Sequence, residues 1–292
     1  MSMIVTLHVF SGRPNPAWVI PEDGAAEFNE RLARITIAAR VSTLKPAGVT
    51  GGLGYRGFTV QDQNGARSIT IHAGVIDPGR HSMTFLTEDR ELERWLLTTG
   101  RTAIPEEVRL YVERDLGTRV LQGPIILKHP PTLACLVCMA HDSPLLDVAL
   151  WSWSSASSAD NNCYNYANDR MTNTFAQPGK GSGHIFTQNN TCTGAGSVEE
   201  AAASDGLVAC SNFNDKLTAG NGWYVALVLW PGHDFHWYRQ DSTGCWSNKV
   251  GGNDASSFDN SHNTIKDPQT ADRGPYTIFC SYMVTKCCLK IR

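Results

Sequence analysis

Cysteine is distributed very unevenly along this chain of 292 residues, and that asymmetry constrains the fold more than any other feature. All nine cysteines follow position 134, in a C-terminal half that is otherwise rich in Asn, Ser, Gly and Thr. Loops of that composition bury little apolar surface, and disulfides offset this by restricting the unfolded chain. Because the number is odd, one thiol stays free if the others pair. The nine are Cys135, Cys138, Cys163, Cys192, Cys210, Cys245, Cys280, Cys287 and Cys288.

The cysteine-free half has the periodicities of a small α+β domain, with apolar residues at helical spacing in some segments and alternating in others. The predicted helices span residues 21–37, 88–98 and 105–116, and the predicted strands span residues 4–10, 58–61 and 67–75. We therefore expect an α+β protein with a small accessory domain over residues 1–123, a linker over residues 124–160 and a second domain over residues 161–292.

The second half contains three runs of aromatic and β-branched residues separated by Gly-containing turns, which predicts an antiparallel meander. The runs lie within residues 222–230, 231–240 and 245–248. His236 is near the start of the middle strand, and folding of the second hairpin brings Asn248 opposite His236 or close to it. A side-chain amide beside an imidazole can fix the tautomer and orientation of that ring.

Cys163 is expected in the first turn of a helix, because Asn161 and Asn162 directly before it are good N-cap residues. There the thiol feels the positive end of the helix dipole, which favours the thiolate and lowers the pKa. The thiolate is the nucleophilic form of cysteine. Cys163 is therefore the candidate catalytic residue, and also the thiol that we expect to stay free.

A cysteine that opens a helix, followed by a histidine that starts a strand and a polar residue at the end of the next strand, resembles the NlpC-type and CHAP-type cysteine peptidases. The resemblance covers roughly residues 151–282. It rests on order and spacing, since Asn162 and Tyr164 stand where that family has an Asp before the nucleophile and a Ser-Gly after it.

The resemblance implies a papain-like α+β domain with an antiparallel sheet that acts as a cysteine peptidase or amidase. Cys163 would be the nucleophile, His236 the general base and then acid, and Asn248 the residue that orients the histidine. Acyl transfer would proceed through a thioester on Cys163, resolved by water or by an amine. The implied substrate is a peptide or a peptidoglycan-like polymer.

Three further residues are candidates for substrate binding in such a site. Tyr164 follows the nucleophile, and Trp237 follows the histidine. His233 lies in the turn before the strand, three residues from His236, and we interpret it as a loop residue near the site rather than as a metal ligand, because a spacing of three on a strand puts two side chains on opposite faces.

The pair Cys135 and Cys138 has the CxxC spacing of redox and zinc sites. A zinc site needs a second pair, and Cys287 and Cys288 are adjacent rather than spaced. Thioredoxin-like chemistry needs a βαβ pattern, which the surrounding residues lack. Disulfide bonding is therefore the preferred interpretation, and we expect neither a metal nor a cofactor.

A second hypothesis makes the C-terminal half a non-catalytic, disulfide-stapled binding or matrix module. In that case Cys163 is one more structural cysteine and the aromatic strands present a ligand surface. The state of the Cys163 sulfur separates the two hypotheses: a free thiol of low pKa beside His236 favours the enzyme, and a bonded sulfur favours the module.

Charge and hydropathy exclude some classes of partner. The net charge of −3 and the pI near 6.3 give no attraction to nucleic acid. No run of about 18 apolar residues is present, so no membrane span is expected.

The N-terminus lacks the basic region of a secretory signal, whereas disulfides suit an oxidising compartment. We expect a protein that is secreted or exported without such a signal, with a cytoplasmic protein as the alternative, and the oligomeric state is left open.

Overall fold

The computed structural model describes residues 1–38, 40–42, 52–79, 84–87, 89–117, 142–152 and 159–292, which form two units. The first unit lies within Met1–Val9, Asn15–Gly51 and Tyr55–Leu127, and the second within Phe10–Pro14, Gly52–Gly54 and Lys128–Arg292. Most of the predicted linker over residues 124–160 is outside the described residues, so the predicted domain boundaries stay a prediction.

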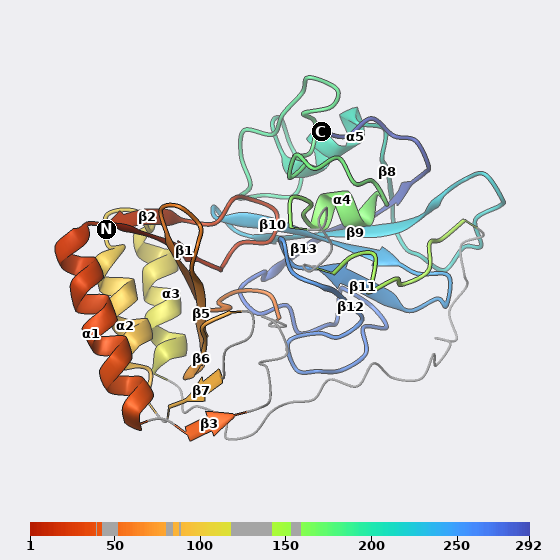
Figure 1. The fold of residues 1–292 in the computed structure, drawn as a ribbon. Coiled ribbons are helices and arrows are strands. Elements are labelled where there is room, and N and C mark those ends of the chain that lie inside the picture. Colours follow the sequence, from red (N-terminus) through yellow and green to blue (C-terminus); the bar gives the residue numbers. More distant parts are fainter. Residues whose placement is uncertain (39, 43–51, 80–83, 88, 118–141, 153–158) are drawn as a thin grey trace. The chain divides into compact units, whose positions relative to one another are not determined.

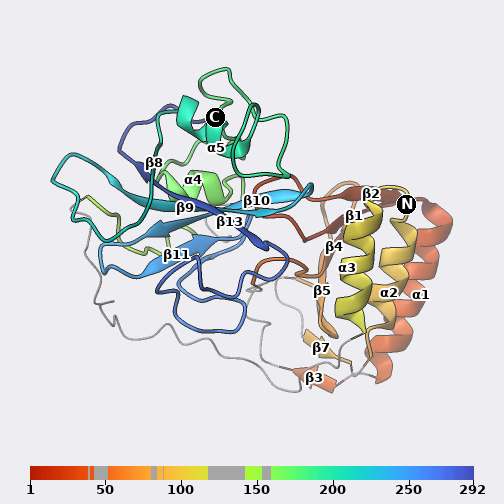
Figure 2. The ribbon, with the colours of Figure 1, turned by 180° about the vertical axis from the view of Figure 1, so that it is seen from behind.

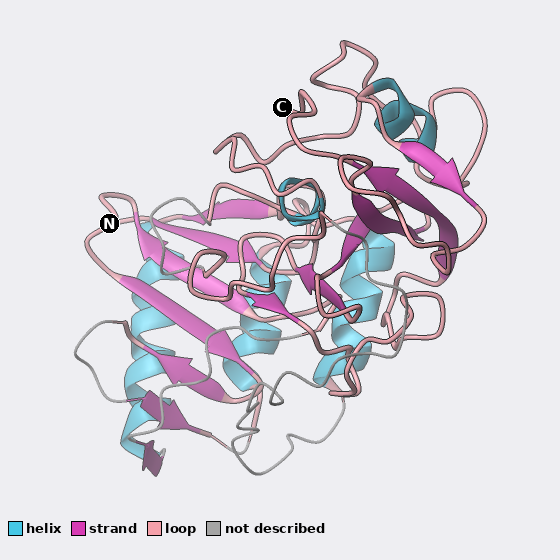
Figure 3. Ribbon diagram, turned by 90° about the vertical axis from the view of Figure 1, so that its right-hand side faces the viewer, coloured by secondary structure: helices cyan, strands magenta, loops and turns pink. Residues whose placement is uncertain are grey.

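The first unit is an antiparallel sheet with helices on one face (Figures 1 and 3). Among the described residues its strand order is β2-β1-β4-β5-β6-β7-β3. The strands are β1 (Met3–Leu7), β2 (Ala17–Ile20), β3 (Arg40–Ser42), β4 (Phe58–Asp62), β5 (Ser68–His72), β6 (Val75–Asp77) and β7 (Thr84–Leu86), and the helices are α1 (Glu22–Ala38), α2 (Glu91–Thr99) and α3 (Glu106–Leu116).

The alternation of apolar residues in the sequence corresponds to alternation of burial in these strands. In β1 every second residue is buried, including Val5 and Leu7. The helices bury the apolar stripes that predicted them, and Phe28 of α1 stacks on Trp95 of α2 with ring centroids 6.1 Å apart. All three predicted helices are confirmed to within a few residues.

One predicted strand of this unit is wrong. Residues 67–75 were expected to form a single strand, but the chain turns at Ala73 and Gly74, where φ is 50° and 75°. Those left-handed values reverse the chain direction, so β5 and β6 pair as an antiparallel hairpin.

The second unit is an antiparallel sheet with the order β12-β11-β10-β9-β13-β8 and two short helices (Figure 2). The strands are β8 (Val208–Cys210), β9 (Trp223–Trp230), β10 (Asp234–Gln240), β11 (Trp246–Lys249), β12 (Ala255–Ser256) and β13 (Ile278–Thr285), and the helices are α4 (Cys163–Ala167) and α5 (Val198–Ser204). The predicted meander is confirmed as β9, β10 and β11. The mixed α and β class is confirmed as well, with two antiparallel sheets and few helices among the described residues.

The two central strands of this sheet are buried on both faces. Every residue of β9 and of β10 is buried, because chain segments cover both sides of the sheet. In β9 these residues are apolar or aromatic, as expected for a strand enclosed on both sides. In β10 they include Asp234, His236 and Arg239, and buried groups of that kind need hydrogen-bond partners.

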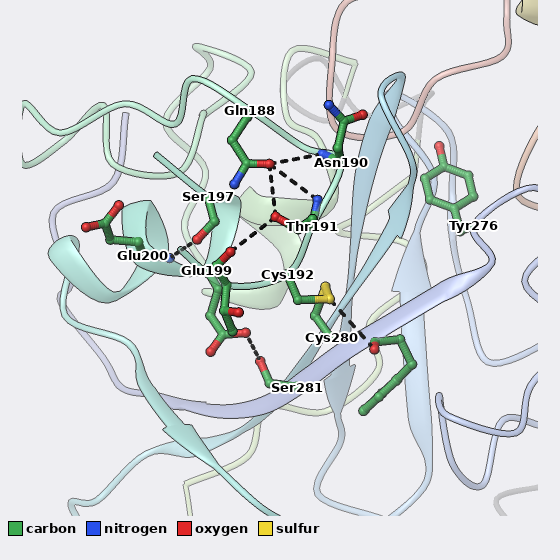
Figure 4. Close-up of a disulfide and its surroundings, with 12 residues drawn as sticks. Gln188, Asn190, Thr191, Cys192, Ser197, Glu199, Glu200, Tyr276, Cys280 and Ser281 are labelled. Carbon is green, nitrogen blue, oxygen red and sulfur yellow. Dashed lines mark hydrogen bonds between the residues drawn. A yellow bond between two sulfur atoms is a disulfide. The ribbon is translucent and has the colours of Figure 1, made fainter. Parts of the chain in front are cut away.

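A disulfide between Cys192 and Cys280 fastens the loop before α5 to β13, across 88 residues of sequence (Figure 4). Ser281 beside it donates a hydrogen bond of 2.9 Å to Glu199 at the start of α5. Cys245 is also disulfide-bonded. Disulfide bonding is therefore present in the C-terminal half of the chain, where the cysteines predicted it.

The expectation of a single free thiol is wrong. Cys163 is free, as expected, but Cys210, Cys287 and Cys288 are free as well. The CxxC pair of Cys135 and Cys138 lies outside the described residues.

Removal of the disulfide with the double substitution Cys192→Ala and Cys280→Ala should lower the free energy of unfolding by about 2–4 kcal/mol, because the loop is then no longer closed in the unfolded chain. Urea unfolding followed by near-UV circular dichroism measures the change. Cys210→Ala is the matched control and should shift the free energy by about 1 kcal/mol or less. Equal losses in the two proteins would show that the disulfide adds nothing beyond the packing of its side chains.

Candidate functional site

The helix that carries Cys163 begins as predicted. Asn162 is the N-cap residue, and its side-chain oxygen accepts hydrogen bonds from the amides of Tyr164 (3.0 Å) and Asn165 (3.1 Å). The Asn165 side chain accepts a hydrogen bond from the Asn162 amide in return, which completes a capping box. Cys163 is the first helical residue, and α4 lies against β10 and β11.

Six polar side chains gather where α4 meets this sheet, and we refer to them as the polar centre. They are Ser11, Cys163, Asp234, His236, Lys249 and Tyr276, and each is 0% exposed. All six belong to the second unit. The sequence predicted Cys163 and His236 as neighbours, and the polar centre contains both.

The Ser11 hydroxyl joins the cysteine to the histidine. Its oxygen lies 2.6 Å from Nδ1 of His236, and it is hydrogen-bonded to the thiol of Cys163. It also accepts a hydrogen bond of 3.3 Å from the amide of Gly251. The thiol makes a further hydrogen bond to the backbone of Trp237.

The expected low pKa of Cys163 is wrong. Burial raises the pKa of this thiol from 9.0 to about 12, and the charge of Asp234 raises it further, while the hydrogen bond from Ser11 and the charge of Lys249 act in the opposite direction. The dipole of a helix of five residues does not outweigh complete desolvation. At neutral pH the sulfur is therefore a protonated thiol and not a nucleophilic thiolate.

Asn248 is not placed to orient His236. In the register of β10 and β11 its partner is Tyr238, two residues beyond the histidine. The Asn248 amide donates to the carbonyls of Ser256 (3.2 Å) and Phe258 (3.5 Å). The Tyr238 ring, two residues along the same strand, lies edge-on to the His236 ring with centroids 4.7 Å apart.

Asp234 holds the segment that carries Ser11. Its carboxylate accepts hydrogen bonds from the successive amides of Ser11, Gly12 and Arg13, and from the hydroxyl of Tyr276. Burial raises the pKa of Asp234 to about 6, and these hydrogen bonds limit the rise.

Gly12 brings this segment directly against the sheet. A Cβ at this position would lie 2.4 Å from the ring of Phe235, so a larger residue does not fit. The carbonyl of Gly12 accepts hydrogen bonds from the side chains of Asn162 (2.9 Å) and Gln177 (2.8 Å). The segment is thus tied to β10 through Asp234 and to the start of α4 through Asn162.

Lys249 interacts electrostatically with Cys163. Its ammonium donates to the carbonyls of Asn161 (2.7 Å) and Gly251 (2.8 Å). Burial lowers the pKa of Lys249 to about 7, an effect that the charges of Cys163 and Asp254 partly offset. No group of three or more His, Cys, Asp or Glu side chains that could hold a metal ion occurs within the described ranges.

The three residues predicted to bind substrate do not share a surface. Tyr164 and Trp237 are completely buried and contact each other, with ring centroids 5.4 Å apart, and the Tyr164 hydroxyl donates to Asp205. His233 is half-buried in the turn before β10, and its ring lies 5.2 Å from that of Trp230. Tyr164 and Trp237 therefore serve as packing, and His233 directly precedes Asp234 of the polar centre.

Sequence reasoning missed Ser11, Asp234, Lys249 and Tyr276 as members of the polar centre. Alternation along β10 puts Asp234 on the same face as His236, so that residue could have been found from the sequence. Ser11 is 225 residues away from His236, and no local pattern indicates that contact.

These features define a class of protein: a mixed α and β chain with a disulfide-bonded antiparallel sheet and a fully enclosed polar centre. The chain belongs to the family of insoluble matrix shell protein 1 of the mollusc Ruditapes philippinarum, to which it is 46% identical over 123 residues, or 42% of this chain and 78% of that protein. No family model matches the chain, and no solved structure matches it.

This relative overturns the enzymatic interpretation. It is a shell matrix protein and not a peptidase, so the predicted resemblance to NlpC-type and CHAP-type peptidases is wrong, together with the hydrolase function that it implied. The papain-like fold that the resemblance also implied is not confirmed. The peptide or peptidoglycan-like substrate depended on that assignment and is withdrawn with it. The burial of Cys163 and its raised pKa are the physical reasons that the site does not present a nucleophile.

Where the structure describes the chain, no helix is both long and apolar enough to cross a membrane.

Replacement of Asp234 by Ala should lower the free energy of unfolding by about 3 kcal/mol or more, because three amides and a hydroxyl lose a buried acceptor. Thermal and urea unfolding measure the loss. Asp160→Ala, at an exposed carboxylate of the same unit, is the control and should change stability by about 0.5 kcal/mol or less. A similar small effect at both positions would mean that the segment around Ser11 does not depend on Asp234.

The buried thiol should also make the protein less stable in alkali. Because the pKa of Cys163 is raised from 9.0 to about 12, the unfolded chain releases the thiol proton at a lower pH than the folded chain does. Stability should therefore fall as pH rises from about 9 to 12, by up to about 1.4 kcal/mol per pH unit from this group.

The measurement is the difference in urea unfolding between the parent chain and Cys163→Ala at several pH values from 8 to 11. The pKa of Lys249 is lowered, so that group contributes with the opposite sign between about pH 7 and 10.5. Its contribution is largely common to both proteins. Parallel pH profiles in the two proteins would contradict the burial of the thiol.

Proposed function

We propose that this chain is a non-catalytic protein of an extracellular matrix, in which the second unit serves as a disulfide-stapled structural module. The observation that carries the proposal is the 46% identity to insoluble matrix shell protein 1, of which the chain covers 78%. A non-catalytic, disulfide-stapled binding or matrix module was the second hypothesis from the sequence, beside the hydrolase.

The polar centre supports a structural role. A catalytic site needs a nucleophile that a substrate can reach, whereas Cys163, His236 and Ser11 are completely enclosed. Within this enclosure the hydrogen bonds of Ser11 to Asp234 and His236, and of Lys249 to Asn161, join segments that are distant in sequence. We therefore assign Cys163 and His236 to the positioning of α4, β10 and the Ser11 segment, and not to chemistry on a substrate.

The cysteines support an extracellular location. Cys192 and Cys280 are bonded to each other, Cys245 is bonded as well, and such bonds persist in oxidising compartments. We take the second unit to be disulfide-rich when it is fully oxidised. A secreted matrix protein meets this requirement without any catalytic role for the remaining thiols.

Fractionation of the tissue that makes the chain tests its location. An antibody against the second unit should detect the chain in the insoluble extracellular fraction and not in the cytosol. Detection in the cytosolic fraction alone, with its cysteines reduced, would contradict the matrix proposal.

Alkylation of the native protein tests the absence of a nucleophile. Iodoacetamide at pH 7 to 8 should label Cys287 and Cys288, which are exposed, and should leave Cys163 unlabelled because its thiol is buried and protonated. Peptide mapping locates the label. Denaturation in urea before labelling is the control and should make Cys163 react. Preferential labelling of Cys163 in the native protein would show that this thiol is a reactive nucleophile and would contradict the structural role.

A further inference from the structure

Two adjacent thiols lie at the surface of the second unit, just after β13. Cys287 and Cys288 are both exposed and are not disulfide-bonded. Their sulfur atoms are only 2.8 Å apart. The polar centre does not include them, and the proposed matrix role makes no use of them.

The backbone turns so that both side chains face the same way. Successive residues of an extended strand point to opposite sides, which would separate the two sulfurs. Cys288 instead has a φ of 72°, in the left-handed region that residues with a Cβ rarely adopt. This conformation brings the second sulfur back towards the first.

The surrounding chain holds this turn at both ends. Before it, Thr285 is buried at the end of β13 and donates a hydrogen bond to the side chain of Asn168. After it, Leu289 and Ile291 are buried, and the carbonyl of Arg292 accepts a hydrogen bond of 2.9 Å from the amide of Gln177. The sulfurs are therefore held together by packing on either side.

From this geometry we propose that Cys287 and Cys288 are a redox modification site that closes to a disulfide between adjacent residues of one chain. The oxidant is a small-molecule disulfide of the glutathione class. The proposal does not depend on the matrix role.

The reaction consists of two thiol–disulfide exchanges. The thiolate of Cys288 attacks one sulfur of the oxidant, the sulfur–sulfur bond of the oxidant breaks, and one small thiol leaves. Cys287 then loses its proton to solvent and attacks the Cys288 sulfur, and the second small thiol leaves. Two protein thiols become one disulfide, and the oxidant takes up two electrons and two protons as two thiols.

The environment supports this order of events. The hydrogen bond and the charge of Cys288 raise the pKa of the Cys287 thiol, so Cys287 retains its proton while its neighbour attacks. Cys210, on the edge strand β8, is half-buried, and burial raises the pKa of its thiol to about 11. Cys210 is thus a poor competitor for the same oxidant.

Closure of the ring would fix the turn through which β13 leads into the C-terminal segment. That segment lies close to the loop that contains Gly181, where a Cβ would be 1.8 Å from the carbonyl oxygen of Lys290. The disulfide would add a covalent constraint to a turn that packing already holds at both ends.

Mass spectrometry of one peptide tests the proposal. The native protein is treated with oxidised glutathione, quenched in acid, denatured without reductant, alkylated with iodoacetamide and digested with trypsin. Cleavage after Lys286 and Lys290 releases a peptide whose only cysteines are Cys287 and Cys288. Most of this peptide should lack the label and be lighter than the reduced peptide by two hydrogen atoms. Retention of both labels, a persistent glutathione adduct or linkage to another peptide would overturn the proposal.

Two variants sharpen the test. Cys287→Ser should stop at the mixed disulfide between Cys288 and glutathione, because no second thiol is present to displace it. Cys210→Ser should form the ring as fully as the parent chain, and loss of the ring in this variant would show that Cys210 is the true partner. In every sample the peptides of Cys192 and Cys280 should remain linked, which verifies that the fold was intact during oxidation.

Discussion

The second unit depends on one buried carboxylate. Asp234 accepts hydrogen bonds from three successive amides, which fixes the segment from Ser11 to Arg13 against the start of β10. That segment carries the hydroxyl that contacts both Cys163 and His236. Burial of a carboxylate is unfavourable, so the interaction persists only because nearly every lone pair of Asp234 has a donor. The enclosure of the polar centre follows from that requirement.

Local patterns predicted the local structure well. The N-cap of α4 is formed by Asn162, as expected, and the meander of β9, β10 and β11 follows the aromatic and β-branched runs. Both depend on interactions between residues near in sequence. The left-handed turn at Ala73 and Gly74 was missed because only the glycine signals it.

Only part of the polar centre could be predicted from the sequence, because Ser11, which joins Cys163 to His236, is remote from both in the sequence. Cys163 and His236 were placed together from order and spacing, but Ser11 lies 225 residues before His236. The predicted direction of the pKa shift of Cys163 was wrong because it, too, depends on a remote segment. A helix N-terminus can be recognised from sequence, whereas the desolvation that outweighs its dipole depends on which distant segment covers the thiol. The order of Cys, His and Asn therefore reflects how α4 packs on the sheet and does not by itself define a catalytic site.

The hydrogen bond between Ser11 and Asp234 spans 223 residues, which has a consequence for how the second unit folds. Contacts between residues so distant in sequence are slow to form, because the closure entropy of the intervening chain must be overcome before the contact contributes. During synthesis, residues 10–14 leave the ribosome long before β10 exists. The unit therefore cannot complete its folding before β10 has been synthesised.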